Sequence, residues 1–287
     1  MIIVRIWEGL GNQMFQYAYA RALQAKGMSV RLDMGKAYDE MFGKYRNHIQ
    51  RTTSIQNFNL RIKPIDVHEY GRYSYLSQDT LVRKMLYVLG KNGMWFYNFY
   101  EEEEQKYSEK AEKIKGNYYI KGWFQSERYF KDIRDILLKE FTPKKKIKIS
   151  KEIREALNHP QSVSVHIRRG DYVKISNTVN LLYYQKAIQY IRQYYKKPVF
   201  LVFSDDLDWV KSNIPVEGEV IYVNEDKKMQ DYEELLVMSK CKSNIIANST
   251  FSWWAAWLNQ NKEKYVIAPK MWFPGQEGIV PKEWIML

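Results

Sequence analysis

The sequence predicts an α/β protein built from two domains, and three observations lead to this prediction. The chain has 287 residues, whereas a single domain usually has roughly 100 to 200. Short apolar runs alternate with helical patterns, as in parallel strands joined by helices. Hydrophobic residues make up 45% of the chain and charged residues 27%, which is typical of a folded globular protein. A lysine-rich break at residues 143–148 predicts domains at 1–145 and 146–287.

The first domain opens with a strand, a polar loop, a helix and a second strand. The loop runs from Glu8 to Asn12, and Gly27 ends the helix. In such a βαβ unit, the loop after the first strand lies at the carboxyl edge of the sheet. The expected strands of this domain are residues 2–7, 28–33 and 118–120, and the expected helices are residues 13–26, 78–89 and 127–141.

The second domain has a clearer pattern of the same kind. The expected strands are residues 162–167, 199–203, 219–223, 244–247 and 265–268. The expected helices are residues 182–195, 207–213, 232–239 and 253–258. This alternation predicts a parallel, Rossmann-like sheet. Trp253, Trp254 and Trp257 have helical spacing, which indicates a helix face packed in the core.

Composition and charge narrow the classes of function. One Cys excludes an internal disulfide, and 4 scattered His leave no zinc pattern. No stretch reaches the roughly 18 apolar residues of a membrane span, so we expect a soluble cytoplasmic protein. The net charge of +12 indicates an anionic partner. Its even spread over both halves disfavours nucleic acid, because nucleic-acid binders usually concentrate basic residues on one face or arm.

Three polar loops of the second domain each follow a strand directly, at residues 166–172, 204–206 and 248–252. Because the strands are parallel, the loops project from one edge, where α/β sheets bind ligands. Arg168 and Arg169 can neutralise a diphosphate through multidentate hydrogen bonds. Asp205 can accept hydrogen bonds from a ribose hydroxyl or a base.

The third loop ends where a helix begins. Free backbone N–H groups and the positive end of the helix dipole suit phosphate oxygens. The loop presents Asn248, Ser249, Thr250, Phe251 and Ser252. From the first domain, Gly11 permits close backbone approach, and Asn12 supplies an amide.

Each of these features also has a structural interpretation. Arginines after a strand are often ion-pair partners, here of Asp171, and His166 at a strand end often only orients its loop. Hydroxyl residues before a helix commonly act as its N-cap. What favours a ligand site is that all three loops fall at one sheet edge.

Four segments resemble the ordered signature segments of glycosyltransferase family eleven, the α-1,2-fucosyltransferases: residues 9–18, 165–172, 203–206 and 248–254. The resemblance implies a GT-B type fold, with two Rossmann-like domains facing a central cleft. It implies an acceptor-side domain at 1–145 and a GDP-fucose-binding domain at 146–287. The implied reaction is inverting transfer of L-fucose from GDP-β-L-fucose to the 2-hydroxyl of a terminal galactose, without a metal. The implied acceptor is an oligosaccharide or a lipid-linked glycan of the O-antigen or capsule type.

The resemblance also implies roles for single residues. Arg168 or Arg169 binds the β-phosphate, and His166 and Asp171 shape that loop. Ser249, Thr250 and Ser252 fall where related enzymes contact the diphosphate, Asp205 where they hold the guanosine, and Gly11 and Asn12 on a loop facing donor and acceptor. The expected catalytic set is thus Arg168, Arg169, Asn12, His166 and Asp171. The expected donor-binding set is Gly11, Asn12, His166, Arg168, Asp205, Asn248, Ser249, Thr250, Phe251 and Ser252. The family's usual glycine is replaced by Glu8, and the motifs identify no general base.

Two alternatives compete with this hypothesis. Asp206 and Asp208 match the Asp-x-Asp pattern of metal-dependent transferases that use other sugar nucleotides. We favour the metal-free interpretation because the arginines and the helix terminus already supply positive charge. The second alternative is a non-catalytic basic protein that binds glycans or nucleic acid, although no nucleic-acid module is recognisable. The basic charge and many aromatic residues also favour peripheral contact with the anionic inner face of the plasma membrane.

Overall fold

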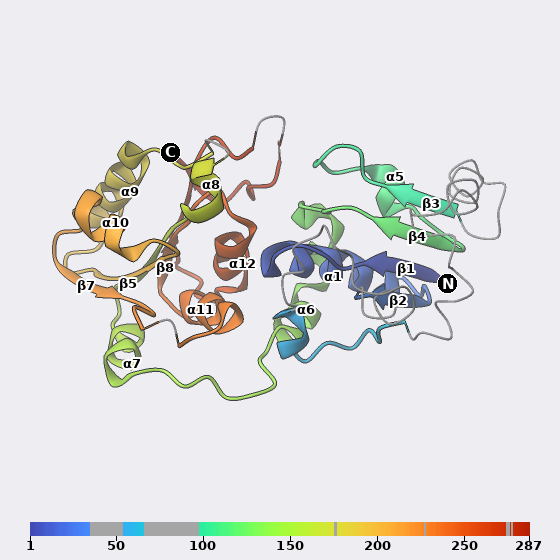
Figure 1. The fold of residues 1–287 in the computed structure, drawn as a ribbon, viewed down its shortest axis with the longest axis horizontal. Helices are drawn as coiled ribbons and strands as arrows, with labels where there is room; N and C mark the ends of the chain where they lie inside the picture. Colours follow the sequence, from blue (N-terminus) through green and yellow to red (C-terminus); the bar gives the residue numbers. More distant parts are fainter. Residues whose placement is uncertain (35–53, 66–97, 175–176, 227, 274–275, 277) are drawn as a thin grey trace. The chain divides into compact units, whose positions relative to one another are not determined.

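The computed structural model in Figure 1 describes residues 1–34, 54–65, 98–174, 177–226, 228–273, 276 and 278–287. The chain forms two compact units, Met1–Lys144 and Lys145–Leu287. The boundary expected after residue 145 falls beside the observed one. The helix expected at 78–89 lies outside the described residues, as does part of the aromatic run 95–100.

Unit 1 is built on a parallel sheet of four strands in the order β2-β1-β4-β3. The strands are β1 (Ile2–Arg5), β2 (Val30–Asp33), β3 (Asn98–Glu101) and β4 (Tyr118–Lys121). Helix α1 (Leu10–Ala25) connects β1 to β2 and buries most of its side chains. It begins earlier than the expected residue 13. Two glycines, Gly9 and Gly11, lower the helix propensity of this segment, but Gly9 serves as the N-cap and the helix starts directly after it.

The helix expected at 127–141 is wrong in its first half. This segment forms two 3₁₀ turns, η3 (Glu127–Tyr129) and η4 (Lys131–Ile133), before α6 (Arg134–Glu140). Phe130 interrupts the helix with a non-helical φ of −142° and is buried against Phe15, with ring centroids 5.9 Å apart. Tertiary packing therefore overrides the local helical preference. The remaining short elements of the unit are η1 (Ser54–Asn57) and α5 (Glu109–Glu112).

Unit 2 contains a parallel sheet of six strands in the order β10-β9-β8-β5-β6-β7. The strands are β5 (Ser162–Ile167), β6 (Val199–Ser204), β7 (Glu219–Tyr222), β8 (Ser243–Ile245), β9 (Val266–Ala268) and β10 (Ile285–Met286). The helices are α7 (Lys151–Asn158), α8 (Gly170–Lys174), α9 (Leu181–Tyr194), α10 (Leu207–Asn213), α11 (Asp231–Met238) and α12 (Thr250–Leu258). The expected strands and helices are confirmed within a few residues, whereas α7, α8 and β10 were not expected.

The core of unit 2 contains the continuous apolar strands and the tryptophan-rich helix. All residues of β5 are buried, as expected for a central parallel strand. Trp253 and Trp254 are fully buried, so their assignment to the core is confirmed. The buried amide of Asn244 donates to Ser164 Oγ at 2.7 Å and to the Met238 carbonyl at 2.9 Å. These bonds join β8 to β5, the two strands that precede the first and third polar loops, and also join β8 to α11.

Candidate active site

The three polar loops of unit 2 leave adjacent strands at the same sheet edge. Strand β5 lies between β6 and β8, with Ile167 opposite Ser204 and Val165 opposite Ile245. The residues after these strands therefore start at neighbouring positions. Their common location at one edge, expected from the sequence, is confirmed.

Two arginine–aspartate pairs join the first loop to the second. Arg168 Nη1 lies 2.9 Å from Asp205 Oδ2, and Arg169 Nε lies 3.2 Å from Asp206 Oδ2. The backbone N–H of Arg169 also donates to Asp205 Oδ1, at 2.9 Å. Both carboxylates of the second loop are thus bonded to the loop of residues 166–172, called the arginine loop below. These bonds fix the two loops relative to each other.

The two arginines differ in how firmly the protein holds them. The guanidinium of Arg169 stacks on the ring of Trp209, 3.3 Å from its centroid, in addition to its bond to Asp206. Arg168 lies 5.5 Å from the ring centroid of Tyr172, and its side chain is one-quarter exposed. The guanidinium has five N–H donors. Arg168 is therefore better placed to bind an anion, and Arg169 to brace the loop against α10.

Gly170 allows the close approach of these two loops. A β-carbon at this position would lie 2.5 Å from Asp205 Oδ2, well inside van der Waals contact. Only a glycine leaves room for the carboxylate that pairs with Arg168. The resemblance includes this glycine in a signature segment, but the spatial reason for it comes from the structure.

His166 is buried at the end of β5. Its ring lies 5.5 Å from that of Phe251, which brings the end of β5 next to the start of α12. Burial and the positive charge of Arg168 lower the pKa of His166 to about 3, so the imidazole is neutral near neutral pH. Its Nδ1 is buried and lacks a hydrogen-bond partner among the described residues. A neutral ring that shapes the loop fits this environment better than a proton-transfer group.

The loop at 248–252 leads into α12, whose first turn starts at Thr250. Ser249 is the N-cap residue, but its side chain makes no capping hydrogen bond, and the first backbone bond to it comes from the N–H of Trp253. The N–H groups of residues 250–252 have no intrahelical acceptor, as in any first turn. The Asn248 amide donates to the carbonyls of Asn177 and Trp272, while its Oδ1 is buried without a partner within the described chain. The turn thus supplies unused donors beside the arginine loop.

Asp206 and Asp208, the two carboxylates that the metal hypothesis requires, have different positions at the start of α10. Asp206 is the N-cap of α10 and accepts from the N–H of Trp209, in addition to its bond to Arg169. Asp208 lies in the first turn of that helix and is not its N-cap. Among the described residues, no group of three or more His, Cys, Asp or Glu side chains could hold a metal ion.

Some residues at this edge were not expected from the sequence. Trp209 and Asp206 hold Arg169, whereas the sequence suggested Asp171, whose side chain lies outside the described residues. Half-buried Glu234 on α11 is a further carboxyl group. Burial, together with the negative charges of Asp231 and Asp205, raises its pKa to about 7, against the lowering effect of the hydrogen bond from the Asn224 amide. Perturbed carboxyls are common in functional sites, but no local sequence pattern distinguishes Glu234.

In unit 1, Gly11 and Asn12 lie in the first turn of α1 and not on the expected loop. The Asn12 amide donates to Glu8 Oε2 at 2.5 Å and accepts from Gln125 Nε2 at 2.8 Å. Asn12 therefore joins the segment after β1 to the segment after β4. Its expected contacts with donor and acceptor remain a prediction.

Glu102, at the end of β3, fixes the segment after β4. Its Oε2 accepts the backbone N–H groups of Trp123 at 2.5 Å and Phe124 at 2.9 Å, while Oε1 is buried without a partner among the described residues. Burial raises the pKa of Glu102 from 4.5 to about 7, although the two N–H donors lower it.

The raised pKa of Glu102 predicts a loss of stability at higher pH. Since the folded state has the higher pKa, the stabilisation is fully present below about pH 4.5 and is lost as the pH rises through about 7. A tenfold change in proton affinity corresponds to about 1.4 kcal/mol, so the full effect is on the order of 3 kcal/mol. We expect Glu102→Gln to weaken the dependence of the unfolding midpoint on pH between about 5 and 8. Parallel melting curves for variant and wild type would contradict this.

Comparison with known proteins identifies the family. The model of the family described as glycosyl transferase family 11 matches residues 1–287. The chain belongs to glycosyltransferase family 11. It is therefore a glycosyltransferase, and the non-catalytic alternative is set aside.

Two relatives from Escherichia coli are similar to this family 11 chain over nearly their whole length. An alpha-1,2-colitosyltransferase is 32% identical, covering 100% of this chain and 99% of the relative. The O-antigen biosynthesis glycosyltransferase WbnK is 31% identical, covering 97% of this chain and 98% of the relative. A galactoside alpha-(1,2)-fucosyltransferase 1 from Saimiri boliviensis boliviensis is 29% identical, covering 33% of this chain and 28% of its own.

A solved structure supports the fold of this family 11 protein. A mutant of Arabidopsis thaliana FUT1 in complex with GDP has a TM-score of 0.51 at 13% identity, covering 92% of this chain and 70% of the other. The expected GT-B type, with parallel α/β sheets in two units, is confirmed. Within the described part of the chain, no helix has the length and hydropathy needed to cross a membrane.

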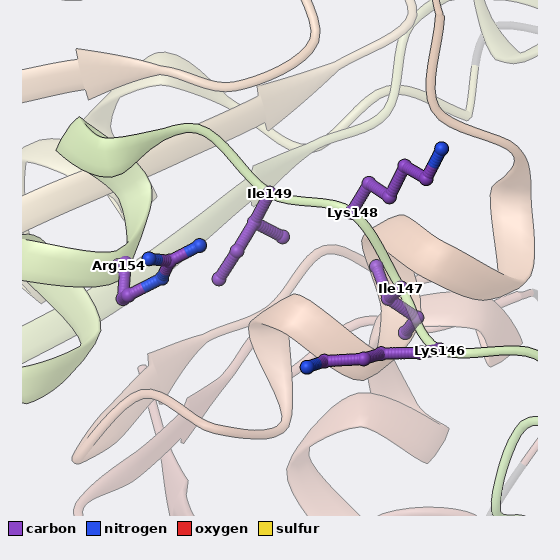
Figure 2. A pocket seen from close by; sticks show the side chains of 5 residues that line it. All are labelled: Lys146, Ile147, Lys148, Ile149 and Arg154. Atoms are coloured by element: carbon purple, nitrogen blue, oxygen red, sulfur yellow. The ribbon is translucent and has the colours of Figure 1, made fainter.

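A pocket of unit 2 lies at the segment that starts the unit. Figure 2 shows its lining residues, Lys146, Ile147, Lys148, Ile149 and Arg154. The three lysine and arginine side chains make this pocket basic. None of the residues expected to bind the donor lines it, so we do not assign it to the transfer reaction.

Proposed function

We propose that this glycosyltransferase is an inverting α-1,2-fucosyltransferase that transfers L-fucose from GDP-β-L-fucose to the 2-hydroxyl of a terminal galactose. The observation that supports it most is the contact of Arg168 with Asp205 at the sheet edge that also carries the start of α12, where His166 and Phe251 are in contact. A cationic fork next to free backbone N–H groups is suited to a diphosphate. Two of the relatives are named for 1,2 linkages and one for O-antigen biosynthesis, and these names are consistent with a glycan acceptor of the O-antigen type.

The chemistry of the reaction explains why such a site is needed. Displacement at the fucosyl anomeric carbon passes through an oxocarbenium-like state while negative charge grows on the departing β-phosphate. Fixed N–H donors aimed at that charge lower the barrier without reorganising. In this proposal Arg168 and the first turn of α12, including Ser249 and Thr250, bind the phosphates, and Asp205 orients Arg168 while contacting the guanosine.

The site also supports a metal-free reaction. The charge that a Mg²⁺ ion would supply to a diphosphate comes here from Arg168 and the helix terminus. The oxygens of Asp206 already accept bonds from Arg169 and from the backbone of Trp209, which makes it a poor metal ligand. We therefore expect turnover without added metal.

A donor panel tests the proposal. GDP or UDP release is measured with GDP-fucose, GDP-mannose and UDP-galactose, each with and without lactose and with and without EDTA. We expect release from GDP-fucose only, dependent on lactose and unaffected by EDTA, and an α-1,2 product by NMR. Release from UDP-galactose that stops with EDTA would contradict the proposal and favour Asp206 and Asp208 as a metal site.

A second candidate donor follows from one relative. Because a relative at 32% identity is named for colitosyl transfer, a nucleotide-activated colitose belongs in the same panel. A higher kcat/KM for the colitose donor than for GDP-fucose would make this chain a colitosyltransferase.

A further inference from the structure

Two loops of unit 1 meet at the carboxyl edge of its sheet, after the neighbouring parallel strands β1 and β4. Trp7 follows β1 and Trp123 follows β4. Their ring centroids lie 5.2 Å apart with an interplanar angle of 47°, and Trp7 Nε1 lies 3.4 Å from the Gly122 carbonyl. Both side chains are only partly buried. The two indoles therefore form one aromatic surface that reaches solvent.

An exposed carboxylate stands beside this surface. Glu8 Oε2 accepts from Trp123 Nε1 at 3.2 Å and from Asn12 Nδ2 at 2.5 Å. These two bonds hold the carboxylate against the edge of the aromatic pair. A carboxylate oxygen can accept more than one hydrogen bond, so Glu8 can hold these groups and also accept from a ligand hydroxyl.

Backbone strain marks the same two loops. Glu8 has a φ of 65° and Phe124 a φ of 51°; the third non-glycine residue with positive φ in the described chain is Asn224. A side chain in the left-handed region costs about 1–2 kcal/mol, whereas glycine adopts it freely. Such strain concentrates in functional sites. A glutamate at position 8 therefore indicates a use for its carboxylate that offsets the strain.

We propose that Trp7, Trp123 and Glu8 form the subsite that binds the galactose ring of the acceptor. In a galactoside the axial 4-hydroxyl leaves the C–H groups of C3, C4 and C5 together on one face. That face can pack on an indole and leave water, while hydroxyls at the ring edge donate to the Glu8 carboxylate. An apolar wall with few fixed polar groups is typical of small-ligand sites.

Glu102 fixes the loop that carries Trp123. Its bonds to the N–H groups of Trp123 and Phe124 fix the loop, and a β-carbon at Gly122 would lie only 2.7 Å from Glu102 Cβ and from the Phe124 ring. The backbone that carries Trp123 is thus fixed before any ligand arrives, which reduces the entropy lost on binding.

The test compares Trp123→Ala and Glu8→Gln with wild type, using the full chain. With saturating GDP-fucose, we expect each variant to raise KM for lactose by about tenfold, which corresponds to roughly 1.4 kcal/mol. KM for GDP-fucose and the Kd for GDP should stay within about twofold. Tyr118→Ala is the matched control, because Tyr118 is a partly buried aromatic residue at the opposite end of β4. It should leave KM for lactose unchanged.

The sugar identity in this inference rests on the proposed function, so a binding measurement separates the two. Saturation-transfer NMR with methyl β-galactoside needs no donor turnover. We expect transfer to the galactoside C–H protons with wild type, and its loss in Trp123→Ala while GDP still binds. If wild type turns over GDP-fucose with lactose and Trp123→Ala keeps the wild-type KM and NMR signal, the subsite is wrong and the function stands. If wild type binds the galactoside through Trp123 but does not use GDP-fucose, the subsite stands and the donor is wrong.

Discussion

Replacing Arg168 with alanine is expected to lower kcat by about 10² to 10³, the usual effect of removing one fixed donor from a developing anion. Arg168 is one-quarter exposed and pairs with Asp205 through Nη1. It follows the end of β5, where His166 contacts Phe251 in the first turn of α12. Arg168→Lys keeps the charge but loses the planar fork, so we expect it to recover only part of the rate. The measurement is GDP release from saturating GDP-fucose and lactose, with GDP affinity determined in parallel.

Arg169→Ala should also lower kcat, by a smaller factor and through another route. Its guanidinium lies between the Trp209 ring and Asp206, so its removal loosens the arginine loop and lowers the unfolding midpoint. Arg192→Ala is the matched control, because Arg192 forms an ion pair with Glu217 elsewhere in the same unit. Wild-type rates in folded Arg168→Ala and Arg169→Ala would refute the site.

Gly170→Ala is expected to lower kcat/KM by about 10²-fold, the order of effect that a displacement near 1 Å has on a positioned group. The added β-carbon would lie 2.5 Å from Asp205 Oδ2. This carboxylate cannot retreat without breaking its bonds to Arg168 and to the N–H of Arg169. The backbone of Gly170 lies outside the left-handed region, so the effect comes from contact and not from φ.

The control for Gly170→Ala is Val173→Ala, an exposed position on the same short helix. It should leave the kinetics unchanged, while Gly170→Ala weakens GDP binding in a protein that retains its circular dichroism spectrum. Unchanged GDP affinity and kcat/KM in Gly170→Ala would show that the Arg168–Asp205 pair does not position the donor.

The strands of unit 2 were predictable from sequence because buried parallel strands are continuous apolar runs between polar loops. Strands β5 and β6 follow the expected bounds closely, and their order in the chain implied that loops 166–172, 204–206 and 248–252 share an edge. Unit 1 was less predictable. Phe130 breaks an apparently helical segment because its burial against Phe15 outweighs helix propensity, and that contact joins residues far apart in the chain.

For the candidate site, too, the sequence predicted some features and only the structure shows others. The types Arg168, Arg169 and Asp205 were recognisable, because a cationic pair and an acidic residue after parallel strands suit a nucleotide diphosphate. Their pairing was not, since the sequence favoured Asp171 over Asp205 and Asp206. Likewise His166 was expected at the site, but only its burial reveals a pKa near 3 and hence a neutral ring.

By itself, the sequence determined the α/β class, the edge at which the polar loops gather, and the family to which the chain belongs. These follow from local periodicity and from short motifs, which need no knowledge of distant contacts. Only the tertiary structure decided that Asp205 binds Arg168, that Gly170 must lack a side chain, and that Glu8 stands beside Trp7 and Trp123. Each of these depends on a distance between segments that are separated by many residues in the sequence. Burial of a side chain and the charges around it depend on the same distances.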